Sequence, residues 1–238
     1  ASQAISAKVA AAVRSLPASN AVGQLAVEFE NAPAADGKSP IGDGKLKLAL
    51  QDFPTEISAG GLARFMGDIR PQGPLTLAAS AGWQGPTNLQ LIVEHLASQG
   101  LSVAAPAYLA TDHPALAIAE GKADLRIAGK QVALRELVLN SSLVQATGQA
   151  TAGEGNLAAA SAEVKAQVNL AELARQFPAT LHMRSDMQLQ SGTAEITLST
   201  SSAGDGRRLM AALRTRDLRG VAGRREVRFD QPLEVDVA

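Results

Sequence analysis

The sequence predicts a mainly β protein, an elongated antiparallel sheet built of repeats with a few short helices. Short segments with an apolar residue at every second position, separated by Gly, recur along most of the 238 residues. Hydrophobic residues make up 46% of the chain, but aromatic residues only 3%. Because aromatic side chains supply much of the buried area of a compact core, this composition favours a thin, repetitive or open layer over a thick sandwich.

Composition also limits the classes of function. The net charge is −1, with 22 basic and 23 acidic residues, so no overall field attracts nucleic acid. The absence of Cys excludes disulfides, thiolate chemistry and Cys-based metal sites. The longest apolar runs fall short of the ~18 to 20 residues that a membrane-spanning helix needs. Because the chain has no initiator Met and no signal-like start, we interpret it as part of a longer protein, without a membrane anchor of its own.

The first element predicted is a short N-terminal helix or linker over residues 1–17. Ile5, Val9, Val13 and Leu16 are spaced as on one face of a helix, and Pro17 ends the pattern.

A first β-repeat unit is predicted over residues 18–120. Segments 23–31 and 44–53 alternate with period two and predict a hairpin. The alternation stops after them, which predicts a short helix near 60–67. It resumes in three further strands, at 73–83, 87–97 and 100–109.

A second β-repeat unit is predicted over residues 121–238. Its strands are interrupted by a short helix near 169–177, where Asn169 can cap the N-terminus and Pro178 ends the pattern. Segment 207–218 could form a helix by its pattern, but Thr215 and the matching strand of the first unit favour a strand. The predicted strands are 121–129, 130–140, 142–152, 161–170, 180–192, 193–202, 207–218, 225–230 and 232–238.

The two units are predicted to be repeats because their helical interruptions match. Residues 62–65 read Leu-Ala-Arg-Phe, and residues 173–175 read Leu-Ala-Arg, with Phe177 two places later. Each interruption follows an alternating strand and precedes a strand led by Gly. Stacked units of this kind explain the pattern more economically than two unrelated domains.

No catalytic, cofactor-binding or metal site is predicted. His95, His113 and His182 stand far apart, in no spacing typical of metal ligation or general-base catalysis. The Gly-rich pieces at 42–45, 153–156 and 204–207 complete no phosphate-loop motif and are typical of hairpin turns.

Arginines gather toward the C-terminus, interspersed with four acidic residues. The simplest interpretation is a solvated sheet face; the alternative is contact with an anionic headgroup or phosphate, for which the guanidinium fork is well suited. The cluster comprises Arg207, Arg208, Arg214, Arg216, Arg219, Arg224, Arg225 and Arg228.

A one-sided apolar lining is the main candidate site. Large aliphatic residues are predicted to share one face of their strands, if a bulge lies near Arg135 and Glu136. This face either packs against protein or holds lipid acyl chains, and the sequence pattern alone does not separate the two. The candidate lining comprises Leu125, Ile127, Val132, Leu134, Leu137, Leu139, Ile196 and Leu198.

Residues 127–152, "IAGKQVALRELVLNSSLVQATGQATA", resemble the repeating strands of the AsmA-like and TamB-like bacterial envelope proteins. Residues 169–201 and the ending "FDQPLEVDV" are similar to repeats of the large members of that group. The resemblance implies a strongly curved sheet, a β-taco or groove, that shields lipids crossing the periplasm. It also implies no catalytic residues, neighbouring repeats of the same protein as partners, and an inner-membrane anchor elsewhere in the parent protein.

Two other functions compete with lipid transport. A structural or adhesive cell-surface module would have two polar faces or a face closed by packing. An enzyme is disfavoured because no cluster of acid, base or nucleophile is visible in the sequence.

Overall fold

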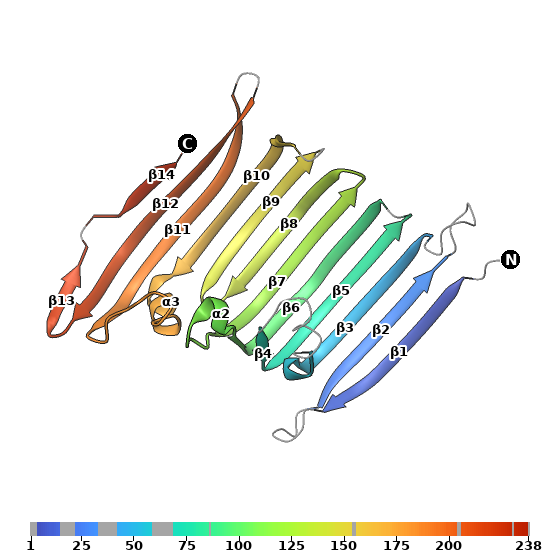
Figure 1. The fold of residues 1–238 in the computed structure, drawn as a ribbon, viewed down its shortest axis with the longest axis horizontal. Coiled ribbons are helices and arrows are strands. Elements are labelled where there is room, and N and C mark those ends of the chain that lie inside the picture. The colour runs from blue at the N-terminus through green and yellow to red at the C-terminus, as the bar shows by residue number, and fades with distance from the viewer. Residues whose placement is uncertain are drawn as a thin grey trace.

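In the described part of the chain, the strands form a single antiparallel sheet of 14 strands, which is not closed. The structure, a computed structural model, describes residues 4–14, 22–32, 42–58, 69–85, 87–153, 156–203, 206–229 and 231–237. In Figure 1 the strands follow one another side by side from β1 to β14 as one elongated layer, and α2 and α3 lie along its lower edge. The predicted mainly β, antiparallel fold is therefore confirmed; the strong curvature implied by the resemblance stays a prediction.

Sequence order and spatial order coincide almost throughout. The path runs β1-β2-β3-β5 and onward in order to β13, while β4 pairs with the end of β6 and β14 pairs with β12. The strands are β1 Ile5–Arg14, β2 Val22–Asn31, β3 Gly44–Pro54, β4 Arg70–Gln72, β5 Pro74–Gln84, β6 Asn88–Ala104, β7 Ala115–Ala128, β8 Gln131–Ser141, β9 Val144–Gly153, β10 Asn156–Asn169, β11 Met187–Ala203, β12 Gly206–Ala222, β13 Arg225–Arg228 and β14 Glu234–Val237.

The predicted N-terminal helix is wrong, because Ile5–Arg14 is strand β1. Ile5 and Val9 satisfy helical spacing, but with Ala7 between them they also satisfy alternation. Pairing with β2, where Val9 opposes Val27, decides between the two patterns. Backbone pairing in the sheet thus overrides the high helix propensity of this Ala-rich segment.

Several other boundaries differ from the prediction. The strands predicted at 87–97 and 100–109 are one strand, β6, whose register shifts against β7; its predicted end is the one-turn helix α2, Pro106–Leu109. Residues 180–186 form turns rather than a strand, and β11 continues to Ala203. The helix predicted near 60–67 lies outside the described residues.

The predicted hairpin of β2 and β3 is confirmed, as is the strand at 207–218, which lies within β12. A short 3-10 helix, η1, follows β3 over Thr55–Ser58. The predicted boundary between units at residues 120 and 121 falls within β7, and the division into repeats stays a prediction.

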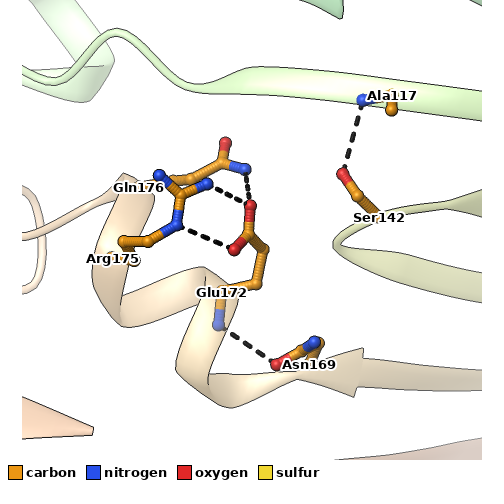
Figure 2. Close-up of polar contacts among 6 residues, drawn as sticks. All are labelled: Ala117, Ser142, Asn169, Glu172, Arg175 and Gln176. Carbon is orange, nitrogen blue, oxygen red and sulfur yellow. Dashed lines mark hydrogen bonds and ion pairs between the residues drawn. The ribbon is translucent and has the colours of Figure 1, made fainter. Parts of the chain in front are cut away.

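The predicted helix near 169–177 is α3, Leu170–Gln176. Figure 2 shows its cap: Asn169 Oδ1 accepts a hydrogen bond from the backbone N–H of Glu172 at 3.1 Å. The Glu172 carboxylate in turn accepts from Arg175 Nε at 2.9 Å and from the buried Gln176 amide. Hydrogen bonds from Arg175, and then from Gln176, lower the pKa of Glu172.

A buried carboxylate ties two of these edge segments together. Asp112, in the turn after α2, is only 6% exposed. It accepts hydrogen bonds from the backbone N–H groups of Ala179 at 3.1 Å and Thr180 at 2.7 Å, in the turn after α3. Because α2 follows β6 and α3 follows β10, this contact clamps the lower edge across the intervening strands.

Replacing this carboxylate should destabilise the protein in a pH-dependent way. Burial raises the pKa of Asp112, but hydrogen bonds from Thr180 and Ala179 and the charge of His113 outweigh it, so the pKa is lowered. Its contribution is therefore present above the ordinary aspartate pKa of about 4 and is lost as pH falls through the lower folded value. We expect Asp112→Ala to lower the melting temperature by about 2–4 °C at neutral pH.

The measurement is thermal unfolding from pH 7 down to pH 3, with the exposed Asp236→Ala as control. The difference between wild type and Asp112→Ala should shrink as pH falls. A difference that stays constant across this range would contradict the assignment.

Candidate functional site: an open apolar face

Strand register places all eight predicted lining residues on one face of the sheet. Across β7 and β8, Leu125 opposes Leu134 and Ile127 opposes Val132. Directly opposed residues of an antiparallel pair share a face, so these four side chains form one patch.

The bulge on which the prediction depends is present in β8. Its pairing with β9 shifts between Leu134 and Leu137, so that Arg135 and Glu136 together occupy one step. A bulge of this kind restores the alternation on the same side. Leu137 and Leu139 therefore lie on the same face as Leu134.

Small residues continue this face toward the C-terminal strands. Leu139 opposes Ala146, Ala146 opposes Ala166, and Ala166 opposes Ile196. Leu198 follows two residues after Ile196 and shares its face. The eight predicted residues thus belong to one continuous surface. Its side chains are smallest over β9, where Ala146, Gly148 and Ala150 lie on it.

The same surface extends through the first half of the chain, which was not predicted from the sequence. Leu125 opposes Leu91 of β6, which in turn opposes Ala81 of β5, and the register continues to Val9 in β1. The alternation within 44–53 and 87–97 carried this signal. We call this surface the apolar face; besides the eight residues, its larger members include Val9, Leu25, Val27, Phe29, Leu46, Leu48, Leu50, Leu77, Trp83, Leu89, Leu91, Val93, Leu96, Val144, Val164, Val168, Leu213, Val235 and Val237.

The opposite face carries the charged side chains of the strands, with a few apolar residues such as Ile92 and Val138 among them. It carries cross-strand and same-strand ion pairs such as Lys45 with Glu30 at 2.9 Å and Arg126 with Asp124 at 3.4 Å. Exposed pairs of this kind contribute little to stability. Their effect is on solubility, because charged side chains keep this face of the sheet hydrated.

No described element covers the apolar face. Among the described residues no large side chain is fully buried, and the buried hydrophobic residues are few: Ala105, Ile118, Leu143 and Ala194. Val132 remains 40% and Ile196 38% exposed. The twelve strands along the path extend over about 50 Å at ~4.8 Å spacing. The apolar face therefore runs over most of the length of the sheet, and contiguous apolar patches of that extent are rare on soluble monomers.

The single Trp of the chain lies on this face. Trp83 opposes Gly44, and a Cβ on Gly44 would come within 2.3 Å of Trp83 Cζ2, so the indole lies over the glycine. Its ring centroid is 5.9 Å from that of Phe29 on β2. Gly44 thus makes room for the ring, as in the pairing of aromatics with strand glycines.

Groups that could carry chemistry do not converge. No three His, Asp or Glu side chains of the described residues form a potential metal site. His95 lies on β6 opposite Ala78, His113 beside the Asp112 clamp, and His182 in the turns after α3. No helix in the described part of the chain is long and apolar enough to cross a membrane.

Comparison with known proteins identifies no relative: no family model, curated protein or solved structure matches this chain. The site must therefore be interpreted from its own geometry. That geometry is a wide layer, apolar and open on one side and charged on the other.

Proposed function

We propose that this chain is a non-enzymatic segment of a periplasmic AsmA-like or TamB-like envelope protein, whose apolar face shields lipid acyl chains from water. The observation that carries the proposal is the apolar face itself, continuous over the sheet and left open by every described element. An acyl chain lying on it would remove apolar area of both partners from water, at ~0.8 kcal/mol per buried CH₂.

The geometry favours this function over a structural or adhesive module. Such a module needs two polar faces, or an apolar face closed by packing. Here the strand register separates the two kinds of side chain throughout the pairs of β9 with β10. In β2 with β3 it does so except at Asn31, on the apolar side, and at the pair of Ala26 with Ala49, on the polar side. The aliphatic side remains accessible, as the exposed fractions of Val132 and Ile196 show.

The outer edge of β1 is where a neighbouring repeat of the same protein could pair. β1 pairs with β2 on one side only, among the described strands. An unpaired strand edge invites pairing with another strand. Neighbouring repeats of the same protein would continue both the backbone ladder and the apolar face in this direction, toward a conduit that serves lipid transport or outer-membrane biogenesis.

Extraction of the purified protein should test the proposal. The protein, isolated without detergent from a bacterial periplasm, is expected to yield phospholipid in a fixed molar ratio when analysed by mass spectrometry. A control protein of similar size passed through the same steps should yield none. Folded protein that is free of lipid, and that does not take up lipid from vesicles, would contradict the proposal.

A further inference from the structure

The C-terminal edge of the sheet contains a notch. Two short strands share the outer edge of β12: β13 pairs with its residues 219–222 and β14 with 211–214. Phe229 and residues 231–233, which lie between the two strands in the sequence, belong to no strand, and Figure 1 shows β13 and β14 as separate strands along β12. This connecting segment stays attached through Thr215 N–H to Leu233 O at 3.0 Å and Phe229 N–H to Leu218 O at 3.1 Å. The hollow left between has a volume of about 460 Å³.

Four arginines line this notch, Arg214, Arg216 and Arg219 from β12 and Arg228 from β13. Two acidic residues line it as well, Asp217 and Glu234, so its described lining is cationic. The predicted arginine cluster is thus divided by the structure, and half of it converges on one hollow.

A bulge in β12 brings these arginines to the same face. Arg214 opposes Glu195, Arg216 opposes Thr193 and Arg219 opposes Ser191. The partners on β11 are two residues apart each time, whereas Arg216 and Arg219 are three apart. The extra residue is absorbed at Asp217, which adopts a left-handed φ of 52°. Without this bulge Arg219 would point to the opposite face. The strained backbone at Asp217 thus places the guanidinium groups on one side of the sheet.

Two of the arginines are placed directly opposite each other. Arg219 and Arg228 are Cα partners across the β12–β13 hairpin. Both guanidinium groups therefore border the same hollow. Arg214 and Arg216 form ion pairs with Glu234 at 3.6 Å and Glu195 at 3.0 Å, which are exposed and exchange readily for a stronger anion.

We propose that this notch binds a phosphate group. Several guanidinium forks facing one small hollow match the oxygen geometry of a phosphate monoester or diester, which Arg binds in bidentate fashion. The group could belong to an anionic phospholipid headgroup or to a soluble phosphate ester. Phe229, which lines the notch, is 48% exposed, and this suits a ligand with an apolar part. The site does not depend on whether the apolar face holds acyl chains.

Titration calorimetry with inorganic phosphate, without lipid, tests the site. The wild type should bind saturably, and Arg219→Gln with Arg228→Gln should weaken binding at least tenfold. The matched control is Arg224→Gln with Arg225→Gln, which removes the same charge from the turn and from the first residue of β13, outside the notch. It should stay within twofold of wild type. Arg219→Lys keeps the positive charge but removes the bidentate guanidinium group, and should weaken phosphate binding about three- to fivefold. This single variant tests the site if the double variant does not fold.

A second arm distinguishes the sources of phosphate. Short-chain phosphatidylglycerol below its micellar concentration should bind at least tenfold more tightly than glycerol phosphate if the ligand is a lipid headgroup, and equally if it is a soluble ester. Absence of saturable phosphate binding, or equal losses in the notch and control variants, would overturn the proposal.

Discussion

Val132→Glu combined with Ile196→Glu is expected to remove lipid from the protein while leaving the sheet folded. Both side chains lie on the apolar face and are 40% and 38% exposed, so the new carboxylates stay solvated when no lipid is bound. An acyl chain on this face would strip that water from them, and desolvating an unpaired charge is very costly. We expect at least a tenfold loss of retained phospholipid per protein, measured by mass spectrometry, with an unchanged circular dichroism spectrum.

The matched control places the same two charges on the other side of the same strands. Ala133→Glu and Thr197→Glu are each one residue further along and therefore face the polar side. This variant should retain lipid within twofold of wild type. Equal loss in both variants would show that total charge governs retention, and unfolding of the first variant would show that the apolar face is packed against protein.

Gly73→Ala should be the most destabilising single substitution at the lower edge of the sheet. Gly73 has a φ of 119°, which residues with a Cβ rarely adopt, and that Cβ would lie 2.4 Å from Gly100 O. Its carbonyl also accepts the Thr55 backbone N–H at 3.1 Å, joining η1 to the start of β5. We expect a loss of about 3 kcal/mol in the free energy of unfolding. This corresponds to a melting temperature lower by about 6–12 °C.

Gly100→Ala is the control for this substitution. Gly100 lies on the facing strand β6, and a Cβ there meets nothing within 4 Å. Its melting temperature should stay within about 2 °C of wild type, in line with exposed substitutions that break no contact. If both variants unfold at the same temperature, the conformation assigned to Gly73 is wrong.

The sequence predicts those parts of the fold that are determined by interactions between residues close together in the chain. Alternation and Gly turns are local, and they predict β2, β3, β8 and β9 closely. The strand predicted at 121–129 covers only the second half of β7, which begins at Ala115. Asn169 and Pro178 likewise bound α3 from short-range chemistry. The segment at Ile5–Arg14 was misassigned because its pattern satisfies both periods, and only β2, a partner further along the chain, decides for a strand.

The candidate site shows the same division. The apolar side of each strand follows from its own alternation. Leu125, Leu134 and Ile196 are therefore predicted to share a face without knowledge of the strand register. The extent of the face could not be predicted, because whether β1 to β6 join β7 to β12 in one layer depends on long-range pairing. The notch depends on a bulge at Asp217, and no local signal marks that position.

The central claim is that acyl chains lie on the apolar face, and Trp83 offers the most direct measurement. Because it is the single Trp and lies on that face, its fluorescence reports on this surface alone. Phospholipids brominated along the acyl chain should quench it saturably, whereas the same lipids without bromine should not. Protein that retains brominated lipid with Trp83 unquenched, for bromine at every position along the chain, would contradict the claim.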